Sequence, residues 1–308
     1  MAIAGRVYDG ELPVPVAAPD LVVVGAASRD ITGDDPRGWR LGGAATYCSL
    51  TAARLGLRVG CLMGVDEEAA GSSELNLIEA AGIDLRRVPL ASGPVFENLE
   101  EDGRRRQRWL SASDVVPALA LPGAWSAARG WLLVPVAGEV PENWANVPMS
   151  EAHVGVGPQG LVREFGADGW VRRVDPEASR VLAAAGLVCG SLDDFGSDMA
   201  LAELRRLAPN AAVVLTGGES GGVVLRGAAT GRYRAIPAPH VVDPTGAGDV
   251  FLAALMAAWL RTGELATPRA LRFAAAAASC AVEGAGLAGV PTLRQVADRL
   301  RGSGRAAS

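Results

Sequence analysis

Short β-rich runs alternate with helical windows along most of this chain, and the alternation limits the folds that it can adopt. Residues 21–26 (LVVVGA) form the first run, and residues 43–55 then repeat apolar side chains at helical spacing until Gly56. Further strands are predicted at residues 59–63, 131–136, 154–156, 187–189 and 213–216, with helical windows at 73–81 and 200–207. This order predicts an α/β fold in which helices cover a largely parallel sheet.

Two stretches interrupt that alternation. Residues 95–100 and 104–110 flank Asp102-Gly103, a dipeptide typical of β-hairpin turns. We interpret the region of about residues 93–111 as a small β lid or side sheet.

The domain organisation follows from length and from the C-terminal pattern. A chain of 308 residues can bury the core of one large domain, which we place at residues 20–301. Residues 1–19 are predicted to be a flexible extension and residues 302–308 a disordered tail. The last third is helical, with helices predicted at residues 247–260, 268–282 and 293–300.

Composition excludes several classes of chemistry. All 29 basic residues are arginine, so a Walker A loop, the catalytic lysine of protein kinases and Schiff-base catalysis are ruled out. A net charge of -5 without a long basic run argues against nucleic acid as the main partner, although residues 104–106 are all arginine. No apolar run reaches the ~20 residues that span a bilayer. The four separated cysteines and the absence of a secretory signal indicate a cytoplasmic protein.

The run Asp243-Pro244-Thr245-Gly246-Ala247-Gly248-Asp249 carries the strongest functional signal. It lies between a strand-like Val241-Val242 and an apolar helix. Amide groups at a helix N-terminus bind anions without lysine, and glycines let the backbone approach the anion. Asp249 is then placed to act as a base toward a hydroxyl group. The simpler alternative is a glycine turn in which Asp249 only caps the helix.

The longer string DPTGAGDVF resembles the C-terminal signature of the ribokinase or PfkB family of carbohydrate kinases. Three further features are similar to that family: the Gly42-Gly43 pair that opens a helix before residues 61–66, Asp30 after the first strand, and the glycines of residues 216–222. The resemblance covers roughly residues 20–292. It implies a ribokinase-like three-layer α/β/α fold with a mainly parallel central sheet and a small β lid.

The resemblance also implies site residues and cofactors. ATP with Mg²⁺ would be the donor, Asp249 the general base, and the amides of Gly246, Ala247 and Gly248 the anion hole. Acceptor contacts are expected from Asp30, Gly42, Gly43, Asn98 and Arg106, and ATP contacts from Thr216, Gly218, Gly221 and Ala277. Asp243 and Thr245 are expected to hold a monovalent cation such as K⁺, and Asp194 to join the magnesium network.

Two segments depart from the family pattern. Ser191 and Asp194 stand where the family carries the Asn and Glu of its NxxE motif. The helix at residues 273–277 reads FAAAA where family members often carry asparagine, so adenine contacts are expected from apolar or backbone groups.

The sequence identifies the class of reaction better than it identifies the acceptor substrate. Residues 96–98, 103–107, 135–139 and 158–160 look similar to a sugar or polyol branch that includes myo-inositol kinases. Asp30 suits a neutral polyol, because a carboxylate accepts hydrogen bonds from vicinal hydroxyls. The arginines at 104–106 fit either substrate contact or a charged hairpin edge equally well. Aromatic residues near the lid are few, so a nucleoside base has less to stack on.

Other classes remain as alternatives. A sugar phosphate or nucleoside kinase, or a non-catalytic sugar-binding regulatory protein, would use the same fold, and a homodimer that exchanges lids is compatible with it. Residues 218–222 fit the GxSxG pattern of serine hydrolases, but no acidic residue lies between Ser220 and His240. Residues 155–160 fit GxGxxG, but too few residues follow for a crossover helix.

Overall fold

The computed structural model describes residues 18–101, 104–195 and 198–305, so the predicted Asp102-Gly103 turn and most of the N-terminal extension lie outside it. Its main sheet has nine strands in the order β15-β14-β13-β12-β9-β8-β1-β4-β5. The seven strands from β13 to β5 are parallel, and β14 and β15 add antiparallel pairs at one edge. The predicted parallel α/β sheet is therefore confirmed.

The strands of this sheet are short, and six of them begin close to where the hydrophobic pattern predicts them, whereas β5 and β15 were not among the predicted strands. They are β1 (Leu21–Ala26), β4 (Val59–Val65), β5 (Asp84–Pro89), β8 (Gly130–Leu133), β9 (His153–Val156), β12 (Leu187–Ser191), β13 (Ala212–Thr216), β14 (Gly222–Arg226) and β15 (Ala229–Tyr233).

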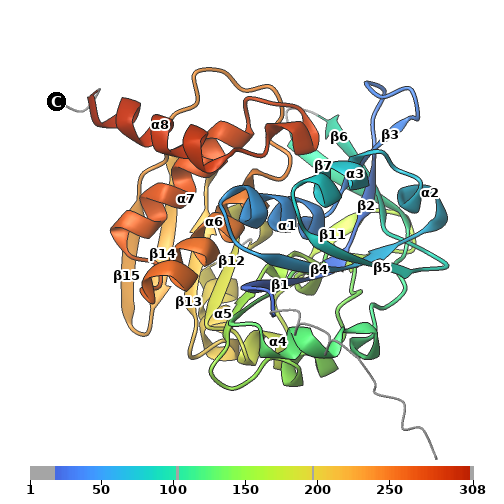
Figure 1. Ribbon diagram of the computed structural model, residues 1–308, viewed down its shortest axis with the longest axis horizontal. Helices are drawn as coiled ribbons and strands as arrows, with labels where there is room; N and C mark the ends of the chain where they lie inside the picture. The colour runs from blue at the N-terminus through green and yellow to red at the C-terminus, as the bar shows by residue number, and fades with distance from the viewer. Residues whose placement is uncertain (1–17, 102–103, 196–197, 306–308) are drawn as a thin grey trace, which may run out of the picture.

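Helices cover both faces of the sheet (Figure 1). They are α1 (Ala44–Arg54), α2 (Glu67–Ala70), α3 (Glu74–Ala80), α4 (Arg180–Ala183), α5 (Asp198–Leu207), α6 (Ala247–Thr262), α7 (Pro268–Ala281) and α8 (Leu293–Arg305). Leu21 and Val23 of β1 pack into the hydrophobic core on the α1, α6 and α7 side, and Val22 and Val24 into the core on the α4 and α5 side. Alternate residues of a strand point to opposite faces, so one apolar strand serves both cores.

A second sheet forms the lid region, on the right of Figure 1. Its four strands have the order β3-β2-β6-β7, with bounds β3 (Trp39–Gly42), β2 (Ser28–Ile31), β6 (Val95–Glu101) and β7 (Arg104–Ser111). The predicted hairpin strands β6 and β7 form, and β2 and β3 extend them. A further hairpin, β10 (Arg163–Phe165) and β11 (Val171–Arg173), contacts β7 through a hydrogen bond from Trp109 N to Gly169 O of 3.0 Å.

Residues 302–305 differ from the expected disordered tail, and residues 306–308 of that tail lie outside the described residues. Helix α8 continues through residues 302–305, past the expected end of the domain at 301. The Ser303 hydroxyl donates to Leu300 O (3.0 Å) and accepts from Arg272 Nη2 (2.9 Å), so contacts with the preceding turn and with α7 extend the helix.

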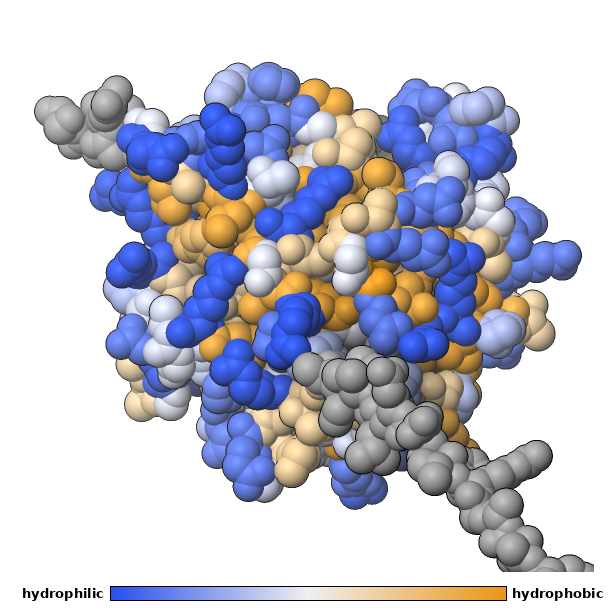
Figure 2. All heavy atoms as spheres, in the orientation of Figure 1, coloured by the Kyte–Doolittle hydropathy of each residue, from blue (hydrophilic) through white to orange (hydrophobic). Residues whose placement is uncertain are grey.

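The molecular surface over α1, α6 and α7 mixes apolar and charged groups. Figure 2 shows hydrophobic residues in the middle of this face, with hydrophilic residues among and around them. Within the described residues, no helix is both long enough and apolar enough to cross a membrane.

Candidate active site

The glycine pair brings the start of α1 against the ends of β1 and β2. Gly43 caps α1 with φ +93°, and a Cβ there would lie 2.5 Å from Ala26 O. A Cβ on Gly42 would lie 2.3 Å from Oδ2 of Asp30. Both positions therefore require glycine, because any side chain would displace either the backbone or the Asp30 carboxylate.

Asp30 lies in a row of side chains that crosses the lid sheet. It pairs with Arg40 on β3 and with Phe96 on β6, and Phe96 pairs with Trp109 on β7. Directly paired residues point to the same face of a sheet, so these four side chains share one face. The Ser28 hydroxyl donates to Asp30 Oδ1 (2.8 Å). We call the face that carries this row the lid face.

The lid face also carries a polar pair. Asn98 and Gln107 lie directly opposite one another, two residues along their strands from Phe96 and Trp109. Gln107 Nε2 donates to Asn98 Oδ1 (3.0 Å). Amide and carboxylate groups thus stand beside an aromatic surface on one face of the lid.

The 243–249 turn lies at the N-terminus of α6, as the sequence predicts. Gly246 caps the helix with φ +76°, and a Cβ there would lie 2.3 Å from the ring of Tyr47. Asp243 Oδ1 accepts from Thr245 N (2.9 Å) and Oδ2 from Gly286 N (3.1 Å), so this carboxylate ties the turn to the loop after α7. The Ala247 amide donates to Pro244 O (3.3 Å), while a Cβ built on Gly248 would meet no atom within 4 Å.

Asp249 occupies the first turn of α6 and is half-buried. Desolvation raises its pKa from the ordinary 3.8 to about 7. The Arg163 guanidinium opposes this rise, and the negative charges of Asp194 and Asp30 add to it. Residues from three separate segments therefore act on one carboxyl group, whose pKa suits a base that works near neutral pH.

Arg163 connects this base to the lid. It donates from Nη2 to Asp194 Oδ1 (2.9 Å) and from Nη1 to Gln107 Oε1 (2.9 Å). Asp194 Oδ2 also accepts from Ser191 N (3.3 Å) in a capping box, so Ser191 and Asp194 form a local cap at this position. The sequence drew attention to Asp194, and to Gln107 within the run 103–107, but not to Arg163, which lies in no turn or glycine motif.

An aromatic cluster corrects the expectation that the lid is poor in aromatic residues. The Trp109 and Phe165 ring centroids are 5.4 Å apart, and those of Phe96 and Phe165 are 6.3 Å apart. Trp109 Nε1 donates to Gly166 O (3.0 Å), which fixes the indole against the β10–β11 hairpin. Phe165 is distant in sequence from the other two rings, so only the tertiary fold assembles the cluster.

Arg106 points away from the polar pair on the lid. It is the neighbour of Gln107 on β7, so its side chain starts from the opposite face of the strand. Its guanidinium carbon lies 3.7 Å from the centre of the Trp170 ring. We therefore leave Arg106 out of the acceptor contacts.

The residues expected to contact the nucleotide lie in two different places, at the end of β13 and inside α7. Thr216 ends β13, and Gly218 and Gly221 follow with φ of +56° and +84°. A Cβ on Gly221 would lie 2.1 Å from Tyr233 O, so glycine lets the connection pass closely over β15. Ala277 has no exposed surface and packs in the core of α7. Its expected contact with ATP is wrong, because a fully buried methyl group cannot line an open site.

The described residues contain no cluster of three or more His, Cys, Asp or Glu side chains that could hold a metal ion. Magnesium does not require such a cluster when phosphate oxygens and water supply most of its ligands. Asp194 fits a supporting role of this kind, since its carboxylate is buried and already polarised by Arg163.

The two rival motifs lack the structures they require. Ser220 ends a short 3₁₀ turn and is followed by strand β14, not by the helix of a nucleophile elbow. Residues 155–160 end β9 and enter a 3₁₀ turn followed by β10, so the crossover helix of a dinucleotide site does not follow.

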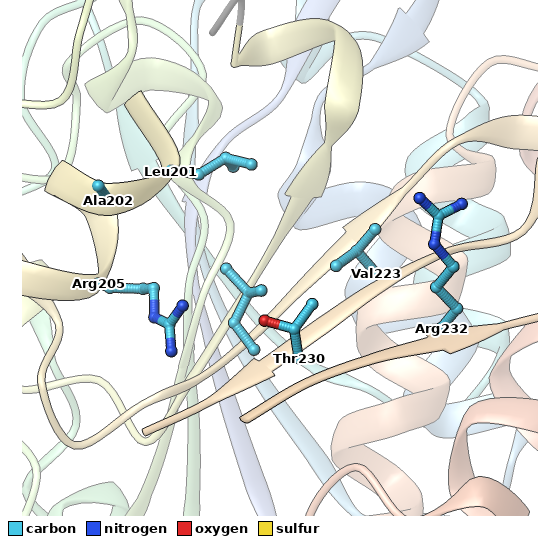
Figure 3. A pocket seen from close by; sticks show the side chains of 7 residues that line it. Leu201, Ala202, Arg205, Val223, Thr230 and Arg232 are labelled. Atoms are coloured by element: carbon cyan, nitrogen blue, oxygen red, sulfur yellow. The ribbon is translucent and has the colours of Figure 1, made fainter. Parts of the chain in front are cut away.

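Two open cavities lie apart from the lid face. One, of about 530 Å³, lies between α5 and the β14–β15 edge, where Arg205 and Arg232 flank an apolar floor that includes Leu201 and Val223 (Figure 3). The other, of about 840 Å³, is lined by residues of the 236–240 loop, the end of α7 and α8. Neither contains a residue predicted for the site.

Comparison with known proteins agrees with this geometry. Residues 171–293 match the pfkB family of carbohydrate kinases. A nucleoside kinase from Methanothermobacter thermautotrophicus is 29% identical over 262 residues, which cover 80% of this chain and 79% of that protein.

Solved structures share the fold over nearly the whole chain. A pyrophosphate-dependent kinase in the ribokinase family, complexed with a pyrophosphate analog and myo-inositol, has a TM-score of 0.70 at 18% identity and covers 91% of this chain and 99% of that one. The nucleoside kinase of Methanocaldococcus jannaschii has a TM-score of 0.69 at 19% identity, with 93% and 99% covered. Arabidopsis thaliana ribokinase, complexed with ribose and ATP, has a TM-score of 0.66 at 20% identity, with 92% and 99% covered.

Proposed function

From the premise that the chain carries a pfkB carbohydrate kinase domain on a ribokinase-like fold and is a phosphotransferase with an alcohol group as acceptor, we propose a role for Asp249. Asp249 activates a hydroxyl of a small sugar or polyol for attack on ATP. One observation supports this assignment above the others. The lid carboxylate Asp30 lies near enough to Asp249 for its charge to raise the pKa of Asp249. A hydroxyl compound held by Asp30 would therefore lie close to the base.

In the proposed reaction, the acceptor oxygen attacks the γ-phosphorus of ATP and its proton passes to Asp249. The bond between the γ-phosphorus and the bridging oxygen breaks, and ADP leaves with that oxygen. Amides at the start of α6, among them those of Gly246 and Gly248, would donate to the transferred group. Ala247 would first have to release its bond to Pro244.

The donor site is proposed at Thr216, Gly218 and Gly221, beside the 243–249 turn. Magnesium bound with the nucleotide would offset phosphate charge, with Asp194 as a supporting carboxylate. Asp243 and Thr245 remain our candidates for a monovalent cation site. Inorganic pyrophosphate is a second candidate donor, since a structural neighbour uses it.

The lid is proposed to close over the acceptor and exclude water, which would otherwise compete as a nucleophile. This assigns residues 20–301 to one kinase domain in which the sheet β3-β2-β6-β7 is the moving part. All four cysteines are free and buried, as suits the reducing cytoplasm in which we place the protein.

The acceptor is proposed to be a neutral polyhydroxy compound, with myo-inositol as the first example to test. Asp30 and the Asn98–Gln107 pair offer acceptors and donors for vicinal hydroxyls. A nucleoside is the second candidate, favoured by the Phe96, Trp109 and Phe165 cluster and by the curated relative. Aromatic rings can stack on a base or on the apolar face of a sugar ring.

A matrix of donors and acceptors tests these alternatives together. ATP and pyrophosphate would each be combined with myo-inositol, pentoses, hexoses, hexose phosphates and nucleosides, and the phosphorylated product measured directly. We expect turnover with a neutral polyol or sugar. Turnover with nucleosides alone would select the second candidate, and no product from any pair would support the regulatory alternative.

Replacing Asp30 by asparagine should raise the KM for the acceptor by roughly 10-fold or more, with little change in the KM for ATP. The variant keeps the size of the side chain but removes the charge that strengthens hydrogen bonds from hydroxyls. Steady-state kinetics with each substrate varied in turn would measure both constants. An equal rise in both would show that Asp30 supports the fold of the site and not the acceptor.

The pH profile of kcat/KM should report the titration of Asp249. The group acts as a base only when ionised, so kcat/KM for the acceptor should rise with pH and reach half its maximum near the pKa of about 7. Because the charge of Arg163 lowers that pKa, replacing Arg163 by methionine should shift the midpoint to higher pH. A profile that is flat from pH 5 to 8 would contradict the role of Asp249.

A further inference from the structure

Arg40 projects from β3 onto the lid face at the end nearest the 243–249 turn. Its Nη1 lies 3.9 Å from Asp243 Oδ2, and its Nη2 lies 3.7 Å from Asp34 Oδ2. Both distances exceed the 2.7–2.9 Å that is usual for a close charge-assisted hydrogen bond. The guanidinium is thus held loosely between two carboxylates, with room for shorter bonds to a ligand.

Tyr47 shows that Arg40 belongs to the same cluster as the base. Tyr47 of α1 is buried, and its ring lies against Gly246 at the start of α6. Burial raises the pKa of Tyr47 well above its usual value, the charges of Asp30, Asp243 and Asp249 raise it further, and the charge of Arg40 lowers it. The Tyr47 hydroxyl is therefore within electrostatic range of three site carboxylates and one lid guanidinium.

The charge balance of this cluster requires a cation when phosphate binds. The charges of Asp30 and Asp194 act on Asp249, and those of Asp30, Asp243 and Asp249 act on Tyr47, so negative charge gathers near the start of α6, and a transferred phosphoryl group brings more of it. In the described part of the chain, the charge of Arg163 acts on Asp249 and the charge of Arg40 acts on Tyr47. Arg163 is already bonded at 2.9 Å to both Asp194 and Gln107, whereas the contacts of Arg40 are long.

We propose that Arg40 binds the phosphoryl group during its transfer and stabilises its developing charge from the lid side. The inference rests on the proposed kinase function. Guanidinium offers paired N–H donors that match two phosphate oxygens. Because the chain has no lysine, arginine is its only residue type with a permanently cationic side chain. Its place on the lid would couple this contact to closure, so that phosphate is stabilised only when water is excluded.

The test compares Arg40→Ala, Arg40→Gln and Arg40→Lys with the wild-type protein, using the donor and acceptor found active. Arg86→Ala, which removes an exposed arginine of β5 that pairs with Asp84, is the matched control. We expect Arg40→Ala to lower kcat by about 10- to 100-fold, with the acceptor KM within about threefold of wild type. Arg40→Lys should retain part of the activity, because its ammonium supplies charge without the paired geometry.

Chemical rescue separates a phosphoryl contact from a structural tether between the lid and Asp243. Millimolar guanidinium chloride should restore part of the kcat of Arg40→Ala and should not stimulate Arg86→Ala. If Arg40 only tethers the lid, Asp243→Asn would reproduce the kinetics of Arg40→Ala, the acceptor KM would rise, and guanidinium would have no effect; that result would overturn the inference. Arg40→Gln serves if Arg40→Ala does not fold.

The same experiment distinguishes this inference from the function on which it rests. A wild-type protein without turnover for any donor and acceptor would refute the kinase proposal and the role of Arg40 with it. An active wild-type protein whose Arg40 variants lose less than about threefold in kcat would overturn the role of Arg40 alone.

Discussion

Replacing Asp249 by asparagine is expected to lower kcat by at least about 100-fold while leaving the fold and ATP binding nearly intact. Asparagine has almost the same shape but cannot accept the proton of the acceptor hydroxyl. Steady-state kinetics with the active acceptor, and calorimetric titration with ATP, would measure the two effects. Asp84→Asn, at an exposed position on β5, is the control and should retain full activity. Turnover of Asp249→Asn within about threefold of wild type would rule out the base.

The same variant is expected to be more stable than the wild-type protein. The folded-state pKa of about 7 lies above the ordinary 3.8, so the folded protein loses stability relative to the unfolded chain as pH rises from about 4 through 7. Asparagine is neutral throughout this range and avoids that loss. The increase in Tm of Asp249→Asn over wild type should therefore be larger at pH 8 than at pH 5. Calorimetry without ligands would measure it, and a lower Tm at pH 8 would contradict the buried charge.

Replacing Glu139 by alanine is expected to cost on the order of 3–5 kcal/mol of unfolding free energy. The Glu139 side chain is fully buried, and its carboxylate accepts from Ala26 N (3.1 Å), Val136 N (2.9 Å) and Ala137 N (2.8 Å). These hydrogen bonds connect the end of β1, where the chain enters the lid, to the loop after β8. Alanine would leave three amides without their acceptor in a dry environment.

Denaturant unfolding of Glu139→Ala, Glu139→Gln and Glu151→Ala would measure this cost. Glutamine keeps one carbonyl oxygen but turns an NH₂ group toward amide donors, so its loss should be intermediate. Glu151 is exposed and bonded to the neighbouring Ser150 hydroxyl, so its removal should leave stability nearly unchanged. A loss below about 1 kcal/mol for Glu139→Ala would show that water replaces the carboxylate.

Much of the main sheet could be predicted because its strands and helices carry their own periodic patterns. β1, β4, β12 and β13 are continuous apolar runs, and α6 is a long apolar helix that begins after a glycine turn. The lid was recognised only in part. β2 and β3 have four residues each and include charged side chains, so neither has a hydrophobic period that distinguishes it from a loop.

The two site predictions that the geometry disfavours, Ala277 and Arg106, share a physical cause. Ala277 was assigned to the nucleotide from its place in a motif, yet burial decides whether a side chain can touch a ligand, and α7 packs it inward. Arg106 was assigned from its charge, yet strand alternation turns it away from Asn98 and over Trp170. In both cases the direction of the side chain depends on its neighbours in the tertiary structure, and these neighbours are not apparent from the sequence.

The 243–249 turn shows where the boundary between sequence and tertiary structure lies. Its glycines, its helix cap and the position of Asp249 follow from local backbone chemistry, so the sequence by itself determined that this segment offers a turn at a helix N-terminus beside a carboxylate. Only the tertiary structure decided what surrounds it. Tyr47, Arg163 and Asp30 come from distant segments and act on or beside Asp249, and Arg40 lies beside Asp243 of the same turn, because the lid sheet, the β10–β11 hairpin and α1 pack around the start of α6.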